Sequence, residues 1–106
     1  MERIVFKKSF NDQGLISKLE LGGMLVLENS VHLKDELVTA SKNLNTKVKI
    51  EVKDIDEIDI SCIQIILAFI KFMDDHHVSY TFEWSLSDDH YLLLENVGFS
   101  NELFLN

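Results

Sequence analysis

The sequence predicts a small α/β domain, with a mixed β-sheet of about five strands and helices packed on one face. The chain has 106 residues, which is enough for one domain, residues 1–106, and too few for two. Residues 48–52 and 80–84 alternate apolar and polar side chains, so each predicted strand has one dry and one wet face. A strand covered by helices on both faces would be apolar throughout. We therefore expect the helices on one side of the sheet only.

The N-terminal part of the chain predicts three strands. Residues 4–10 form the first, the turn-forming residues 11–14 close it, and residues 15–21 alternate as the second strand of a hairpin. The glycine pair at residues 22–23 predicts a flexible turn. The short apolar segment at residues 24–27 then predicts a third strand.

Three helices complete the predicted fold. Apolar residues recur at helical spacing through residues 30–44, which predicts an amphipathic helix facing the core. Residues 62–74 are almost wholly apolar and predict a second, more buried helix. A third is expected to begin at Ser87 and to end before Gly98, because serine and glycine are favoured at the two ends of a helix.

The start of the second helix carries a capping pattern. Ser61 and Gln64 have the spacing of a capping box, and Ile60 and Ile65 occupy the positions of a hydrophobic staple. This pattern predicts Ser61 as the N-cap residue. The segment before the helix, residues 54–60, is rich in acidic residues and is predicted to be a recognition loop.

Composition restricts the class of partner. Eighteen acidic residues against ten basic residues give a net charge of −8, which disfavours nucleic acid and anionic membranes and favours a protein partner with basic patches. The apolar run at residues 65–70 is far shorter than the roughly 20 residues that span a bilayer, so we expect no direct membrane insertion. The N-terminus lacks the long apolar region of a signal peptide. We therefore expect a cytoplasmic protein, in which Cys62 has no cysteine partner.

Three segments in the same order resemble one known family. LELGGML at residues 19–25 resembles the second strand, turn and third strand of the STAS domain, the sulfate transporter and anti-sigma-factor antagonist domain. DISCIQ at residues 59–64 resembles its conserved Asp, two small residues and Gly-Leu before an apolar helix. LENVGF at residues 94–99 resembles its last helix and closing glycine. The resemblance implies a STAS fold whose working surface is the second helix and the loop before it.

The resemblance also implies partner switching, in which a kinase phosphorylates a Ser or Thr after the conserved Asp. Here Ile60 occupies that position and has no hydroxyl, so Ser61 is the nearest candidate for phosphorylation. Ser61 has the alternative role of a helix cap. Cys62 replaces the usual glycine, and it is either a small buried residue or a thiol activated by the helix N-terminus.

The second helix supplies the remaining candidate contacts. A narrow outward stripe on this helix consists of Gln64, Ala68, Lys71 and Asp75. Ile60 and Leu67 flank the stripe. Apolar side chains beside the exposed strip of a helix are typical of a partner site, although neighbouring helices could instead cover them. The candidate partner-binding residues are Asp56, Asp59, Ile60, Ser61, Gln64, Leu67, Ala68 and Lys71.

No catalytic, metal or cofactor motif is recognisable. The clusters at residues 74–77 and 88–90 combine Asp and His, but neither has the i, i+4 spacing that brings two histidines together on a helix. We therefore expect a non-enzymatic interaction module without a bound metal or cofactor. As the STAS resemblance implies, its partner would be an anti-sigma factor or a serine/threonine kinase. The alternatives are an accessory subunit that binds a transporter ATPase in phospholipid transport, and a small-ligand or nucleotide sensor.

Overall fold

The computed structural model describes residues 3–85, in which four strands form one mixed sheet with the order β1-β2-β3-β4. The strands are β1 (Ile4–Phe10), β2 (Ile16–Leu25), β3 (Leu44–Ile58) and β4 (Ser79–Trp84). β1 and β2 are antiparallel, whereas β2 with β3 and β3 with β4 are parallel. The third helix predicted from residue 87, and the segment at residues 94–99, lie outside the described residues.

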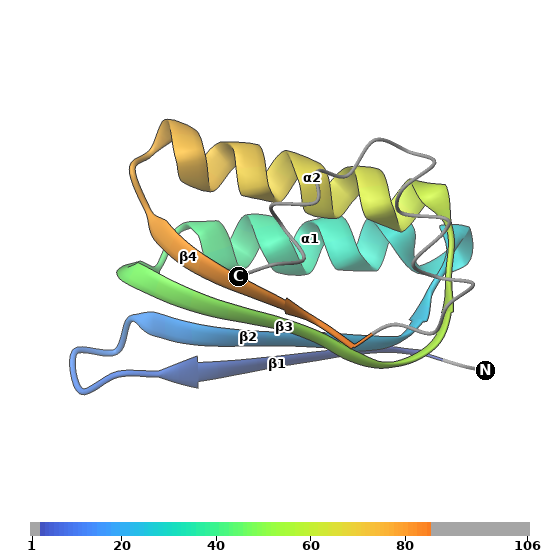
Figure 1. Cartoon of the computed structure of the whole chain (residues 1–106), viewed down its shortest axis with the longest axis horizontal. Helices are drawn as coiled ribbons and strands as arrows, with labels where there is room; N and C mark the ends of the chain where they lie inside the picture. The colour runs from blue at the N-terminus through green and yellow to red at the C-terminus, as the bar shows by residue number, and fades with distance from the viewer. Residues whose placement is uncertain (1–2, 86–106) are drawn as a thin grey trace.

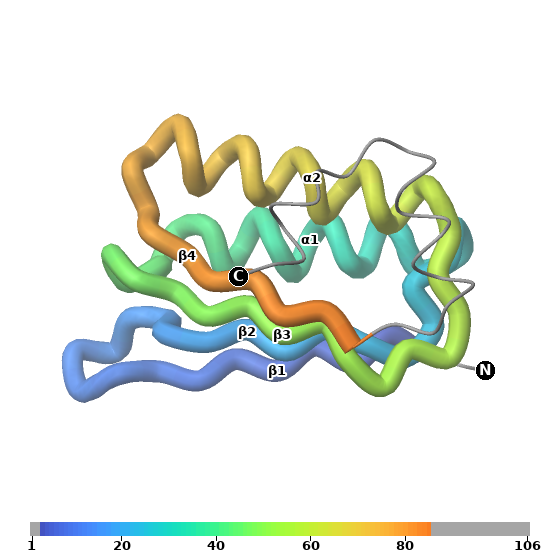
Figure 2. Tube along the Cα trace, viewed as in Figure 1, coloured from blue at the N-terminus to red at the C-terminus, as the bar shows by residue number. Residues whose placement is uncertain are grey.

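The helices join the parallel strands and cover one face of the sheet. A short 3-10 helix, η1 (Leu27–Asn29), leads into α1 (Ser30–Ser41), which connects β2 to β3, and α2 (Ile60–Asp75) connects β3 to β4. α1 and α2 lie side by side and run in the same direction (Figure 1 and Figure 2). The prediction that helices cover only one face is therefore confirmed for the described residues. The predicted first helix is too long, because Leu44 already begins β3.

The core lies between the helices and the sheet. Along β3 the side chains of Val48, Ile50 and Val52 are buried while the residues between them point to the other face. Leu33 and Leu37 of α1 are buried as their spacing predicts. α2 contributes more buried residues to the core than α1 does. They are Cys62, Ile63, Ile66, Phe69, Ile70 and Met73.

The glycine pair does not form the predicted turn. β2 runs through Gly22 and Gly23, and its register against β3 shifts on both sides of Gly23, which has a φ of +75°. A Cβ atom at Gly22 would collide with the carbonyl oxygen of Lys53, so glycine is required where the two backbones approach closely. The pair therefore marks an irregularity within one strand, and the predicted separate strand at residues 24–27 is wrong.

The predicted acidic loop is also wrong, because residues 54–58 are the last part of β3. This 15-residue strand pairs with β2 as far as Ile58 opposite Leu25. Asp54 has a φ of 52°, and after it the core-facing residues Ile55 and Ile58 are three positions apart instead of two. The break in the two-residue period conceals the strand in the sequence.

Candidate functional site

The first turn of α2 is capped by Asp59 and not by the predicted Ser61. The backbone N–H of Ser61 donates to Asp59 Oδ1 at 3.1 Å, and the Ser61 hydroxyl donates to the same oxygen. Asp59 has the extended backbone of an N-cap, with φ −129° and ψ 176°. With the cap at Asp59, the staple positions fall on Ile58 and Ile63, which are both buried. The predicted capping box is therefore wrong, and Gln64 is left exposed.

Asp59 also joins the start of α2 to the segment that follows β2. The backbone N–H of Leu27 donates to Asp59 Oδ2 at 2.9 Å, and the N–H of Asp59 donates to the Leu25 carbonyl at 3.0 Å. Burial raises the pKa of Asp59, but the hydrogen bonds from Ser61, Leu27 and Cys62 outweigh it, so the pKa lies below its usual value. Both carboxylate oxygens are thus engaged within the domain. Asp59 positions the surrounding site and does not offer a free carboxylate to a partner.

Cys62 is a buried structural residue. Its side chain has no exposed surface, and its sulfur lies 3.4 Å from the carbonyl oxygen of Val26. Burial, together with the negative charge of Asp59, raises the pKa of the thiol to about 11. The activated-thiol alternative is therefore excluded, and the interpretation of Cys62 as a small buried residue is the one that fits.

Large apolar side chains are exposed at the end of the helical layer where α1 and α2 begin. Leu27 is 64% exposed, Val31 is 69% exposed and Ile60 is 48% exposed. Leu27 and Ile60 are neighbours, because the carboxylate of Asp59 binds the backbone of Leu27, and Val31 lies about one helical turn after Leu27. We call these three residues, Leu27, Val31 and Ile60, the end patch.

The predicted strip on α2 extends from the end patch. Gln64, Ala68 and Lys71 are exposed as expected, at the spacing of one helical face after Ile60. Leu67 is half-buried and packs against the core. It is therefore neither fully covered by the neighbouring helix nor fully exposed to a partner. The structure therefore brings Ile60, Gln64, Ala68 and Lys71 onto one face.

A shallow apolar groove separates α1 from α2 beside this strip. It has a volume of about 140 Å³ and is lined mainly by apolar side chains, with Ala68 at its border. Val38 of α1, which is 48% exposed, forms part of the opposite wall. Its lining residues are Leu37, Val38, Ser41, Ile65, Ala68, Phe69 and Phe72. Exposed polar residues, Lys34 and Asp35 on α1 and Gln64 on α2, lie along the helices between this groove and the end patch.

Acidic residues border the end patch. Glu28 follows Leu27 and is exposed, and Asp56 is exposed near the end of β3. Within residues 3–85, neither Glu28 nor Asp56 forms an ion pair, because all the ion pairs between described residues lie on the sheet. The site therefore presents apolar side chains together with negative charge.

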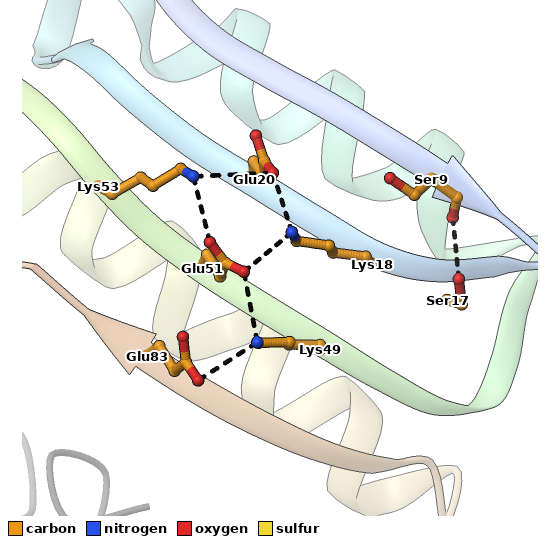
Figure 3. A network of polar contacts seen from close by, with 8 residues as sticks. All are labelled: Ser9, Ser17, Lys18, Glu20, Lys49, Glu51, Lys53 and Glu83. Atoms are coloured by element: carbon orange, nitrogen blue, oxygen red, sulfur yellow. Dashed lines mark hydrogen bonds and ion pairs between the residues drawn. The ribbon is translucent and has the colours of Figure 1, made fainter.

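The open face of the sheet has a different arrangement of charge. Lysines and glutamates alternate across β2, β3 and β4 and point toward one another (Figure 3). Glu51 lies at the centre of the network. Its carboxylate oxygens are 3.0 Å from Lys18 Nζ, 3.5 Å from Lys49 Nζ and 3.4 Å from Lys53 Nζ. The hydrogen bond from Lys18 lowers the pKa of Glu51 to about 2. The lysines and glutamates of this network therefore neutralise one another.

The Asp-His segment at residues 74–77 forms the end of α2. His77 has a φ of 57°, and the N–H groups of His77 and Val78 donate to the carbonyls of Asp74 and Met73, which is a Schellman ending. The His76 ring stacks on Phe72, and its Nδ1 lies 2.9 Å from the Phe72 carbonyl oxygen. In the part of the chain that the structure describes, no three His, Cys, Asp or Glu side chains converge. The second cluster, at residues 88–90, lies outside that part.

The sequence predicts Ile60 and the α2 strip as candidate contacts, but it does not predict Leu27 and Val31. Leu27 falls in the strand predicted at residues 24–27, and Val31 lies off the buried stripe of its helix. An exposed valine in the first turn of an amphipathic helix was the signal that could have drawn attention to this end.

Comparison of the chain with models of known protein families finds no match, and neither does a search of the curated proteins. Neither α1 nor α2 is long and apolar enough to cross a membrane. The structure shows a small α/β domain with a mixed four-stranded sheet, and the similarity to STAS domains stays a resemblance of short sequence segments.

Proposed function

We propose that this protein is a non-enzymatic, STAS-like interaction module that docks a regulatory protein through the end patch and the α2 strip. The observation that carries this proposal is the grouping of Leu27, Val31 and Ile60, three large apolar side chains, at one end of the helical layer. Grouped apolar side chains with a polar border are typical of protein-binding surfaces. A partner that covers them gains the free energy of burying their apolar area.

The charge around the site favours a basic partner surface. Glu28 and Asp56 border the end patch, and the whole chain carries a net charge of −8. Complementary charge at the border of an interface speeds association and selects among partners more than it adds affinity. The central contacts would be apolar, with basic side chains of the partner around them.

The partner class follows from the STAS resemblance. We propose an anti-sigma factor or a serine/threonine kinase-like regulator in the cytoplasm, contacted at the position where the family carries its phosphorylated residue. Ile60 makes this position an apolar contact. Ser61 is half-buried and donates its hydroxyl to Asp59, so phosphorylation would break this bond and place two anions together. Phosphorylation of Ser61 therefore has little support.

Capture of the partner by tagged protein from native lysate tests the proposal. The Ile60→Asp and Val31→Asp variants place a charge in the end patch and should lose the partner. Thr81→Asp, which adds the same charge at an exposed position on β4, is the matched control and should keep it. Mass spectrometry then identifies the partner, and a transporter ATPase would favour the alternative of an accessory transport subunit.

Circular dichroism must show that each variant is folded. If both end-patch variants are folded and still capture the partner as well as the wild type, the docking surface lies elsewhere and the proposal fails.

A further inference from the structure

β1 is the outermost strand on its side of the sheet (Figure 1). Among residues 3–85 it pairs with β2 alone, so its other edge carries main-chain N–H and C=O groups without a strand partner. Such an edge can accept a further strand through directional hydrogen bonds.

The register identifies the outward main-chain groups. The N–H of Met24 donates to the carbonyl of Arg3 at 3.0 Å, which makes these two residues a hydrogen-bonded pair. Hydrogen-bonded and non-hydrogen-bonded pairs alternate along an antiparallel ladder, and the register from Ile4 to Ser9 is unbroken. The main-chain groups of residues 5, 7 and 9 therefore point to β2, and those of residues 4, 6 and 8 point outward.

All charged residues of β1, and Arg3 just before it, are basic. Arg3, Lys7 and Lys8 are basic, and residues 3–10 include no acidic residue, although the chain as a whole has a net charge of −8. Lys7 is exposed, and the Lys8 ammonium lies 5.9 Å from the centre of the Phe6 ring. Pairing of β1 with the β1 of a second copy in antiparallel register would place these lysines close together, which is unfavourable.

We propose that the outer edge of β1 binds an extended acidic segment of a partner protein by strand addition. The main chain of residues 4, 6 and 8 hydrogen-bonds the added strand. Lys7, opposite Glu20, and Lys8, opposite the buried Leu19, point to opposite faces of the sheet, so acidic side chains on both faces of the added strand lie beside them. Val5 and Phe10, which are 41% and 57% exposed, contact its apolar residues. This interaction is separate from the end patch, because it uses the edge of the sheet and the opposite sign of charge.

The test measures the fluorescence anisotropy of a labelled peptide that repeats Glu-Glu-Val-Val, so that both faces of the added strand carry acidic and apolar side chains. The protein should bind it, and binding should weaken as ionic strength rises from about 50 mM to about 500 mM. A matched peptide with Lys in place of Glu should bind at least about tenfold more weakly. A fully N-methylated Glu-Val peptide, which lacks backbone donors, should also lose binding.

Two variants of one residue separate the backbone contribution from the charge. Lys8→Pro removes an outward N–H without removing a bond to β2, and it should weaken binding at least about tenfold. Lys8→Gln keeps the N–H and should weaken binding only about two- to fivefold.

Three results of the peptide test would overturn the proposal. They are absence of binding at about 1 mM protein, equal binding of the Glu and Lys peptides, and undiminished binding of the N-methylated peptide. A concentration-dependent dimer that Lys8→Pro abolishes would assign the edge to a second copy of the chain and would equally contradict an acidic partner. The N-methylated peptide keeps the test decisive if the proline variant does not fold.

Discussion

The open face of the sheet and the end patch are both exposed, but their charges are used differently. On the open face, Glu51 contacts three lysines and its pKa falls to about 2. At the end patch, Glu28 and Asp56 form no ion pair with any residue of the described chain, and exposed apolar side chains lie beside them. The comparison teaches that exposure and charge do not by themselves locate a partner site. The two surfaces differ in whether their charged side chains form ion pairs. The paired charges of the open face hold neighbouring strands together, whereas the charges at the end patch have no ion-pair partner among the described residues.

The largest expected effect is at Asp59, which holds the end patch together. Asp59→Ala removes the N-cap of α2 and the acceptor for the Leu27 N–H, and should lower the free energy of unfolding by about 3 kcal/mol. Asp59→Asn keeps an acceptor oxygen and should cost about 1 kcal/mol. Urea denaturation measures both. Equal stability of Asp59→Ala and the wild type would show that the cap does not fix this end of the molecule.

A smaller effect is expected along α2, where neighbouring residues differ in burial. Leu67 packs partly on the core, so Leu67→Asp should destabilise the domain by about 2 kcal/mol. The adjacent variant Ala68→Asp, at an exposed position, should change stability by less than about 0.5 kcal/mol. Thermal melts of the pair are the measurement. A Leu67→Asp variant as stable as Ala68→Asp would mean that Leu67 is available to a partner.

The open face predicts a pH dependence of stability. The folded-state pKa of Glu51 falls from 4.5 to about 2, so the folded protein binds fewer protons than the unfolded chain in this range. Its contribution to stability is therefore complete above about pH 4.5 and is lost as the pH falls toward about 2. Asp59, whose pKa is also lowered, acts in the same direction.

Denaturation curves recorded across this pH range test the assignment. The decline of stability toward low pH should be shallower in Glu51→Gln. It should also be shallower in Lys18→Gln, because loss of the Lys18 hydrogen bond lets the pKa of Glu51 rise. An unchanged slope in both variants would show that the ion pairs of the open face do not act in solution.

The smallest effect is expected at Cys62, which lies beneath the end patch. The thiol is buried and its pKa is raised to about 11, so iodoacetamide should not modify it in the folded protein at about pH 8. The same reagent should modify it fully in denaturant. Rapid alkylation of the native protein would show that the start of α2 opens readily.

The parts of the fold with an unbroken period could be predicted from the sequence. Alternation at residues 48–52 and 80–84 correctly predicted strands with one open face, and the spacing of Leu33 and Leu37 predicted the buried side of α1. The errors occur where the period is broken. Gly23 and Asp54 adopt positive φ values beside register shifts, so β2 resembled two strands and the end of β3 resembled a loop.

The candidate site could be predicted only in part, because long-range contacts determine the rest. Asp59 and Ser61 are both good N-cap residues, and Asp59 has the further contact with the N–H of Leu27, which is 32 positions away in the chain. The exposure of Leu27 and Val31 depends on where η1 leaves the sheet. Local sequence carries no signal for the contact between Asp59 and Leu27, and for the exposed patch the only local signal is that Val31 lies off the buried stripe of its helix.

Chemical-shift mapping of the ¹⁵N-labelled protein with its captured partner tests the central claim most directly. The proposal predicts that the largest amide shifts centre on Leu27, Val31 and Ile60 and extend along α2 to Lys71. Amides around Lys18, Lys49 and Glu83 on the open face should remain unchanged. Shifts that centre on the open face, with the end patch unaffected, would contradict the account.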